Sequence, residues 1–190
     1  MLRIEMWGFF CRTVNTYTLN FRYGSTITVP GTGILLNNEM DDFSAKPGVA
    51  NFFGLTGAEF NAIAPQKRML SSMTPTIVLK DGKAYLVTGS PGGSKIITTV
   101  LQLILNLIDH QLNIATATNA IRVHHQWLPD QLFVEQGLNG DTIQLLNYKG
   151  YKISVDDSMG STQSIMYINN SFEGASDPRR PGALTKWLLT

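Results

Sequence analysis

The 190-residue chain is 43% hydrophobic and 15% charged, a composition that supports one sizeable core in a single domain and excludes a disordered protein. Its 15 basic and 14 acidic residues leave a formal net charge of +1, and its single cysteine excludes an internal disulfide. No basic cluster stands out along the chain, so neither nucleic acid nor an anionic membrane is an expected partner.

The first third of the chain contains one predicted strand and one predicted loop. The first ten residues, MLRIEMWGFF, include Glu5 and lack a continuous apolar core, so no signal peptide is predicted. The alternating stretch TVNTYTLNFRYG predicts a strand on which Thr18 and Asn20 share one face. Residues 47–62 are rich in Gly and Asn with scattered aromatic side chains, which is typical of an irregular loop able to act as a lid.

The middle of the chain predicts a hairpin followed by a helix. In TPTIVLKDGKAYLVTG, two apolar runs flank Asp81 and Gly82, so strands over residues 76–80 and 83–88 should pair antiparallel. The stretch IITTVLQLILNLIDHQL is too short and too often interrupted by polar residues for a membrane span. It is apolar around nearly its whole circumference, which predicts a helix covered on most sides by other layers.

The last third predicts two more helices and three strands. A second helix is expected over residues 114–123, and a two-turn amphipathic helix between Asp141 and Gly150. The runs YKISV, STQSIMYIN and SFEGAS have the composition of strands. The order of strands, helices and strands predicts an α+β fold with a mainly antiparallel sheet.

A glycine-rich turn, Gly89 to Ser94, joins the predicted hairpin to the helix. Its spacing does not fit a phosphate-binding loop, because Gly92 and Gly93 are adjacent and Lys95 comes one place late. Two adjacent glycines do allow bare N–H groups to approach one oxygen, as in an oxyanion hole. A tight strand-to-helix turn without any ligand is the alternative.

Two polar clusters suit a ligand that resembles an amino acid. Glu39 and Asp42 in NNEMDD offer carboxylates for an ammonium group, and Ser71 and Ser72 in LSSMTP offer hydroxyls for a carboxylate. The alternatives are a solvated acidic turn and serines that cap the backbone.

The stretch HHQWLPD resembles a metal-binding motif, but its two adjacent histidines cannot both face one ion on a regular element. A structural cluster of His and Trp is expected there instead. Neither a metal nor a cofactor is predicted.

Several longer motifs occur together in this sequence. They are GILLNNEMDDFSAKPG, KRMLSSMTPTIVLKDGK, LVTGSPGGSKIITTVLQ, HHQWLPD, MGSTQSIM and GASDPR. In this order they resemble the small, C-terminal subunit of gamma-glutamyltranspeptidase, also called glutathione hydrolase. The resemblance covers residues 13–185 and divides the chain into an unmatched segment, 1–12, and a small-subunit domain, 13–190.

The resemblance implies part of an αββα sandwich of the N-terminal-nucleophile hydrolase type, in which two helical layers enclose two antiparallel sheets. In this family a precursor cuts itself and exposes a threonine, whose hydroxyl attacks the gamma-glutamyl amide and forms an acyl-enzyme. The implied partner is the large subunit of the same precursor. The implied substrates are glutathione and other gamma-glutamyl compounds, with amino acids, dipeptides or water as acceptors, in the periplasm or outside the cell.

The resemblance also assigns roles to individual residues. It implies that Thr18 supports the nucleophile and that the donor's α-amino group is held by Asn20, Glu39 and Asp42. It implies further that Ser71 and Ser72 hold the donor's α-carboxylate, and that Gly92 and Gly93 form the oxyanion hole. Residues 47–58 correspond to the lid loop, where Phe52 and Phe53 stand in place of the tyrosine at its tip.

The sequence departs from the family pattern at its start. The stretch MLRIEMWGFFCR stands where the family has paired threonines, and no threonine precedes Thr13. The chain is therefore predicted to lack the nucleophile and to be inactive alone. The alternatives are a non-catalytic remnant or binding module, or a fragment of a related cephalosporin acylase. Asp42 together with Ser71 and Ser72 favours a glutamyl donor over the substrate of an acylase.

Overall fold

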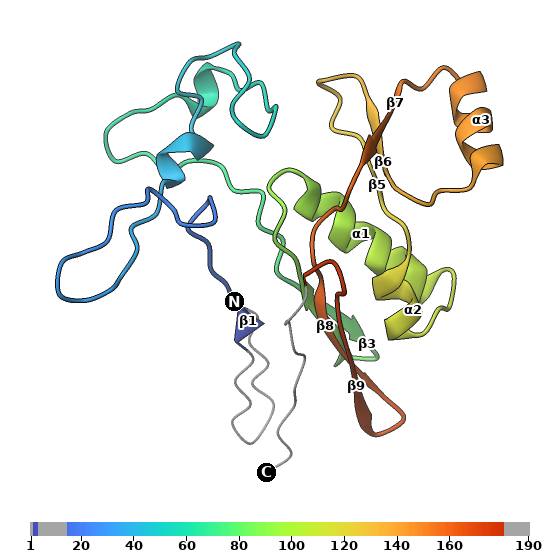
Figure 1. Cartoon of the computed structure of the whole chain (residues 1–190). Coiled ribbons are helices and arrows are strands. Elements are labelled where there is room, and N and C mark those ends of the chain that lie inside the picture. Colours follow the sequence, from blue (N-terminus) through green and yellow to red (C-terminus); the bar gives the residue numbers. More distant parts are fainter. Residues whose placement is uncertain (1, 4–14, 181–190) are drawn as a thin grey trace. The chain divides into compact units, whose positions relative to one another are not determined.

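The computed structural model describes residues 2–3 and 15–180, which divide into two units (Figure 1). Unit 1 comprises residues 17–72. Unit 2 comprises residues 73–180 together with the short strands β1 (Leu2–Arg3) and β2 (Asn15–Thr16), which pair with each other. Each unit has its own network of contacts.

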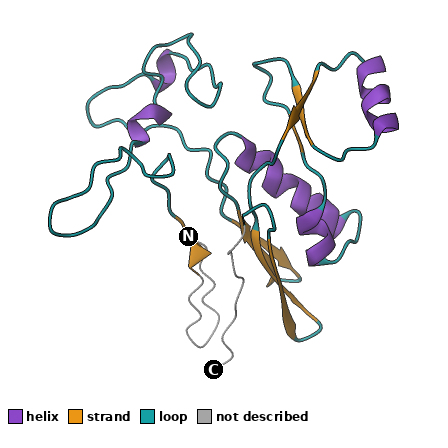
Figure 2. Ribbon diagram, in the orientation of Figure 1, coloured by secondary structure: helices purple, strands orange, loops and turns teal. Residues whose placement is uncertain are grey.

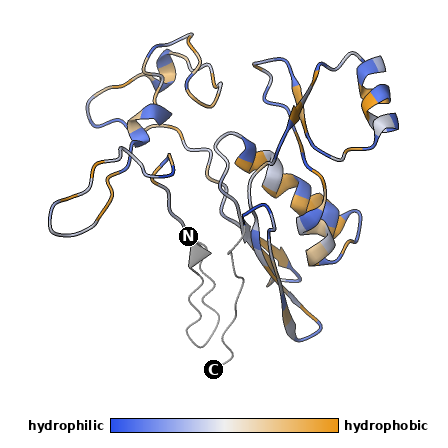
Figure 3. Ribbon diagram, viewed as in Figure 1, coloured by the Kyte–Doolittle hydropathy of each residue, from blue (hydrophilic) through white to orange (hydrophobic). Residues whose placement is uncertain are grey.

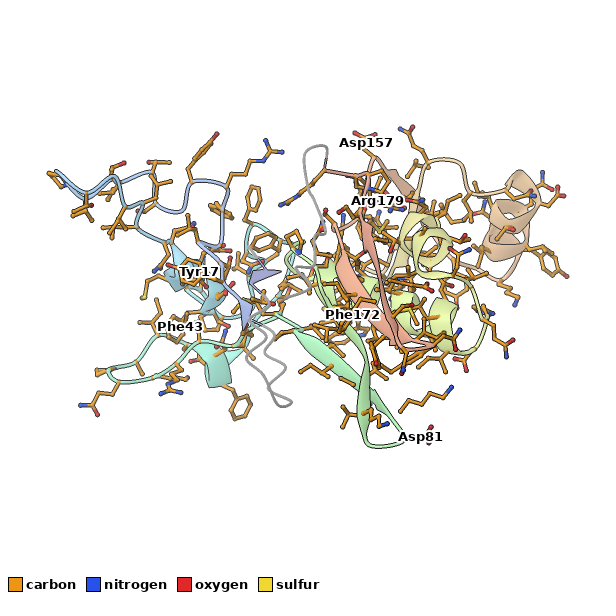
Figure 4. All side chains as sticks on the ribbon, turned by 90° about the horizontal axis from the view of Figure 1, so that it is seen from below. Tyr17, Phe43, Asp81, Asp157, Phe172 and Arg179 are labelled. Atoms are coloured by element: carbon orange, nitrogen blue, oxygen red, sulfur yellow. The ribbon has the colours of Figure 1, made fainter. Side chains whose placement is uncertain are left out.

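Unit 2 is built on a four-stranded antiparallel sheet with the order β3-β4-β8-β9. The strands are β3 (Thr76–Lys80), β4 (Lys83–Gly89), β8 (Gln163–Ile168) and β9 (Ser171–Ser176). The predicted hairpin is confirmed, and Asp81 lies at its tip (Figure 4). Asp81 and Gly82 have φ values of 52° and 72°, the left-handed pair that a two-residue hairpin turn requires.

Two helices cover one face of this sheet (Figures 1 and 2). They are α1 (Lys95–Ile108) and α2 (Ile114–Asn119). The core between the two layers joins side chains of helices and strands: Leu103 and Leu107 of α1, Ile114 and Ala117 of α2, and Leu86, Met166 and Ala175 of the sheet. Burial of these apolar side chains is the main force that holds the two layers together.

Helix α1 is buried on one face only, which corrects the expectation of cover on most sides. Ile96, Val100 and Leu103 are almost fully buried, whereas Ile97 and Leu101 are 52% and 50% exposed. With Leu105 and Ile108 these two residues form an apolar stripe, here called the α1 stripe. The alternation of hydrophobic and hydrophilic positions along α1 is visible in Figure 3. The sheet alone supplies too little surface to cover a helix that is apolar all round.

A second, three-stranded sheet has the order β5-β6-β7, with β5 (Val123–His124), β6 (Leu132–Glu135) and β7 (Ile153–Asp156). Helix α3 (Gly140–Tyr148) begins at Asn139, whose side chain accepts from the Asp141 N–H, and it connects β6 to β7. A strand pair joined through a helix runs parallel, and β6 and β7 do so. The prediction of a mainly antiparallel sheet therefore holds for the larger sheet alone.

Two predicted elements have different bounds in the structure. The second helix ends at Asn119, not at residue 123, because the chain turns into β5, which pairs with β6. The strand predicted from TVNTYTLNFRYG is wrong for its described part, since only residues 15–16 lie in a strand. Asn20 has a left-handed φ of 70° and donates its N–H to the Thr18 hydroxyl, a local side-chain bond that competes with strand pairing.

Unit 1 consists mainly of loops, with two short 3-10 helices, η1 (Glu39–Asp42) and η2 (Glu59–Asn61) (Figure 2). The apolar run GILL before the acids forms an isolated bridge between Thr28 and Leu35 and no regular strand. The predicted loop over residues 47–62 is confirmed, with an isolated bridge between Ala50 and Thr56 inside it. The chain as a whole is α+β, as predicted.

Candidate active site

The predicted site residues divide between the two units. Six belong to unit 1: Thr18, Asn20, Glu39, Asp42, Ser71 and Ser72. Gly92 and Gly93 belong to unit 2.

Thr18 and Asn20 lie together through their backbone and not, as predicted, on one face of a strand. The Asn20 N–H donates to Thr18 Oγ1 over 2.8 Å, and Asn20 Nδ2 donates to the Asn38 carbonyl over 3.1 Å. In return Asn38 Oδ1 accepts from the Phe21 N–H over 3.2 Å. The asparagine pair thus joins the segment of Thr18 to the start of η1. Sequence reasoning missed Asn38, although it lies inside the quoted run NNEMDD.

The carboxyl groups of η1 interact with one another, and among the described residues no ion pair joins them to a cationic side chain. Burial and a hydrogen bond with Asp42 raise the pKa of Glu39 to about 7, while burial is the main cause that raises the pKa of Asp42. Glu39 Oε1 and Asp41 Oδ2 are buried without a hydrogen-bond partner among the described residues. A buried carboxylate without a partner is costly, so this cluster favours a cation.

Ser71 and Ser72 follow directly after a residue that is tied to the acids. The Leu70 N–H donates to the Asn61 side chain, and the same side chain bonds the Asp42 carbonyl. The Asn61 side chain therefore joins the backbone of Asp42 to the backbone of Leu70, the residue directly before the two serines. No local sequence signal pointed to Asn61.

The loop over residues 47–58 packs Phe52 and Phe53 on the ring of Phe21, the residue that follows Asn20. The Phe21 ring lies 4.8 Å from Phe52 and 5.8 Å from Phe53, measured between centroids. Phe52 remains 78% exposed. Where the family resemblance implied a tyrosine at the tip of the lid, this chain has an aromatic cluster of three rings, here called the phenylalanine cluster.

The glycine turn of unit 2 presents two backbone N–H groups at the start of α1. Gly92 and Gly93 have φ values of 142° and 57°, in the region that glycine favours. Their carbonyls accept the first N–H groups of α1, from Lys95 and Ile96. Within the part of the chain that the structure describes, neither glycine donates its own N–H in a hydrogen bond. Both N–H groups are thus available to an anionic oxygen.

A second glycine backs this turn. A Cβ on Gly92 would lie 3.4 Å from the Gly160 Cα, and Ser161 donates its N–H to Ser90 Oγ over 2.9 Å. The segment over residues 159–162 therefore forms the support on which the glycine turn rests.

A buried ionic network holds that supporting segment. Arg122, 3% exposed, donates to the Met159 carbonyl over 2.6 Å and pairs with Asp177 over 2.6 Å. Glu135 accepts from the Met159 N–H over 2.7 Å and pairs with Arg179, labelled in Figure 4. Burial acts against ionisation of Asp177, but Arg122 and several hydrogen bonds outweigh it and lower the pKa of this carboxyl. Sequence reasoning missed this network.

The histidine stretch has a structural role, and the predicted grouping of His with Trp is present, since the Trp127 N–H donates to His125 Nδ1 over 3.1 Å. His124 is 2% exposed and its ring lies within 2.8 Å of the Thr98 hydroxyl and 2.9 Å of Gln126 Oε1. Burial lowers the pKa of His124. Trp127 is 77% exposed. Over residues 2–3 and 15–180, no group of three or more His, Cys, Asp and Glu side chains has a metal-binding arrangement.

Comparisons with known proteins point to one family. The family model described as Gamma-glutamyltranspeptidase matches residues 13–187. The glutathione hydrolase proenzyme of Escherichia coli K12 is 61% identical over 171 residues, which are 90% of this chain and 30% of that protein. The chain thus spans about 30% of the length of such curated relatives.

Solved structures share the fold. A mutant gamma-glutamyltranspeptidase of Helicobacter pylori is 49% identical with a TM-score of 0.88, and the match covers 95% of this chain and 98% of that chain. A cephalosporin acylase of Bacillus halodurans is 28% identical with a TM-score of 0.73, over 88% of this chain and 30% of that chain. The fold is therefore that of the N-terminal-nucleophile hydrolases, and the first of these structures is the nearer of the two in sequence and in shape.

Proposed function

Because this chain belongs to the gamma-glutamyltranspeptidase family, we propose that it forms the C-terminal, small-subunit part of an enzyme that cleaves gamma-glutamyl amides. The donors would be glutathione and other gamma-glutamyl compounds, and the acceptors amino acids, dipeptides or water. The observation that carries the proposal is the acid cluster of η1. Two buried carboxyl oxygens, of Glu39 and Asp41, lack hydrogen-bond partners among the described residues, and the pKa of Glu39 is raised to about 7, as expected of a site that is completed by the α-ammonium of a donor.

The other candidate residues complete the donor site in this proposal. Asn20 acts with Glu39 and Asp42 at the α-ammonium, and the hydroxyls of Ser71 and Ser72 hold the α-carboxylate. Both ends of the donor are then fixed by charge-assisted hydrogen bonds, each worth about 1.5–3 kcal/mol. A donor held at both ends presents its γ-carbonyl in one orientation, which is what a displacement at that carbonyl needs.

The reaction proposed for the complete enzyme is acyl transfer. A threonine hydroxyl, supported by Thr18, attacks the γ-carbonyl and passes its proton to its own α-amine; the carbonyl electrons form an oxyanion held by the Gly92 and Gly93 N–H groups. The intermediate collapses, the amide nitrogen leaves with that proton, and an acyl-enzyme remains. Water or an acceptor amine then releases the glutamyl group.

The 190-residue chain does not itself supply the nucleophile in this proposal. Residues 1–12, which lie outside the family match, contain no threonine. The second candidate function, a binding module without catalysis, rests on this observation. A fragment of an acylase related to cephalosporin acylase is less favoured, because of the nearer match to the transpeptidase structure.

The partner proposed for this chain is the large subunit of the same proenzyme. The exposed α1 stripe supports this partner, since monomeric proteins seldom leave such rows of apolar side chains uncovered. On the sheet, Ile77, Val87 and Ile165 lie in register on adjacent strands and none of them is fully buried. Leu101→Glu should reduce recovery of the large subunit in co-purification, whereas Leu145→Glu on α3, at a leucine that is exposed still further, should leave it unchanged.

No helix among the described residues has the length and apolar character to cross a membrane. By family we propose the periplasm or the cell exterior as the site of action, which fractionation of cells that express the tagged protein would test.

The central experiment measures release of the anilide from a chromogenic gamma-glutamyl anilide, with and without an acceptor dipeptide. A full-length proenzyme, in which residues 13–190 follow the large subunit and a segment that supplies the nucleophilic threonine, should turn over, and Asp42→Ala should raise its donor KM strongly. The isolated chain should match the buffer blank but bind L-glutamate in calorimetry. Absence of turnover by the full-length protein would refute the enzymatic proposal, and absence of glutamate binding as well would also refute the binding module.

A further inference from the structure

We propose that Asn61 is the positioning residue that fixes the separation between the two ends of the donor site, an inference that rests on the function proposed above. Its Nδ2 donates to the Asp42 carbonyl over 2.7 Å, and its Oδ1 accepts from the Leu70 N–H over 3.1 Å. Asp42 belongs to the proposed ammonium site, and Leu70 directly precedes the serines proposed for the carboxylate. One side chain therefore bridges the backbone of Asp42 and the backbone of the residue that precedes the serines.

The backbone of Asn61 is itself held in place. Its N–H donates to the Ala58 carbonyl over 3.0 Å within η2, and its carbonyl accepts from the Ser44 N–H over 2.9 Å. A Cβ on Gly57 would lie 1.9 Å from Ser44 Oγ, so the loop before η2 packs directly on the chain that follows η1. With its backbone fixed on both sides, the Asn61 side chain has little freedom to adjust.

A fixed separation has a chemical purpose in this site. The α-ammonium and the α-carboxylate of a glutamyl donor are attached to the same carbon atom, so the protein groups that bind them must also stand at one distance. A primary amide is suited to this task because it donates and accepts at once. Alanine at this position removes both bonds, whereas aspartate keeps the acceptor toward Leu70 and loses the donor toward the Asp42 carbonyl.

The test uses the complete enzyme with Asn61→Ala and Asn61→Asp, and with Asn113→Ala as a matched control. Asn113 caps α2 in unit 2 through a bond of the same kind, from the Thr116 N–H. Two donors are compared: a gamma-glutamyl anilide and its analogue without the α-carboxylate. For the full donor, Asn61→Ala should raise KM about tenfold, the effect of about 1.4 kcal/mol, with kcat changed less than about twofold.

The analogue distinguishes positioning from a general structural loss. It engages only the ammonium half, so Asn61→Ala should change its kcat/KM less than about threefold. While the parent enzyme is active, an equal loss of kcat/KM for the two donors, or an unchanged KM for the full donor, would overturn the positioning role of Asn61 but leave the proposed function standing. A parent enzyme that releases no anilide from either donor would instead refute the proposed function.

A second measurement tests the Asn61 hydrogen bonds to Asp42 and Leu70 directly and does not depend on enzymatic activity. Amide exchange at Leu70, followed in the 190-residue chain, should accelerate in Asn61→Ala and remain slow in Asn61→Asp, since a carboxylate still accepts that N–H. Asn113→Ala should leave Leu70 unaffected. Unchanged exchange at Leu70 in Asn61→Ala would overturn the proposal, because the bridge would then not hold the segment before the serines.

Discussion

Replacement of Gly160 by alanine tests how tightly the glycine turn is supported from behind. A Cβ at this position would lie 2.6 Å from Ser90 Oγ and 3.0 Å from two side-chain atoms of Thr99, and φ is +66°. Ser90 cannot rotate away freely, because its hydroxyl accepts the Ser161 N–H. A left-handed alanine costs about 1–2 kcal/mol and overpacking about 1–3 kcal/mol. We therefore expect Gly160→Ala to lower the free energy of unfolding by about 3 kcal/mol.

The matched control is Gly150→Ala. Gly150 also has a positive φ, +92°, but no heavy atom lies within 4 Å of its added Cβ, so only the conformational cost of about 1 kcal/mol applies. Urea denaturation of both variants and the parent chain measures the difference, which should be about 2 kcal/mol. Equal losses in the two variants would refute the tight packing of Gly160 behind the turn.

Three further predictions concern other parts of the chain. Asp177→Asn should lower the free energy of unfolding by about 3–5 kcal/mol, since it leaves Arg122 buried without its charge partner. The control Asp157→Asn, at an exposed residue, should lower it by less than about 0.5 kcal/mol. Similar losses for the two variants in urea denaturation would contradict the role of the buried ionic network. The folded pKa of Glu39 is raised from 4.5 to about 7, so the stability that its protonated form contributes is complete below pH 4.5 and is lost as pH rises through 7. After allowance for solvent screening, the free energy of unfolding should fall by about 1 kcal/mol over this pH range. Urea titrations should show a weaker pH dependence in Glu39→Gln than in the parent chain, and an equal pH dependence in the two would count against the prediction. Phe21→Ala should speed amide exchange over residues 47–58 about tenfold by removing two ring contacts. The control Phe172→Ala, which removes a ring contact of β9, should leave exchange in that loop unchanged. Unchanged exchange in Phe21→Ala would show that the phenylalanine cluster does not restrain the loop.

Features governed by neighbours in sequence were predicted well. The β3–β4 hairpin follows from Asp81 and Gly82, whose left-handed conformations suit a two-residue turn. Helix α3 follows from its polar start and its stop at Gly150, although its cap proved to be Asn139. In both cases the deciding interactions lie within a few residues, where composition reports on them directly.

Features that depend on distant contacts were missed or misjudged. The alternating pattern around Thr18 predicted a strand, yet hydrogen bonds from Asn20 to Thr18 and Asn38 direct the chain into a turn. Arg122 and Asp177 are separated by 55 positions, so no local pattern pairs them. In the acid cluster, the residue types were predicted from sequence, but the raised pKa of Glu39 requires the burial that only the fold provides.

The division of the candidate residues between two units has a consequence for how such an enzyme diversifies. The residues proposed to select the donor lie in unit 1, and the glycine turn with its ionic support lies in unit 2. The hydrogen bonds described here for each group stay within its own unit. In the proposed enzyme, substitutions that accumulate around the acids and serines would shift donor preference while the glycine turn and its ionic support are inherited unchanged, so that changes in donor preference and changes in the oxyanion-binding turn arise in separate stretches of the gene.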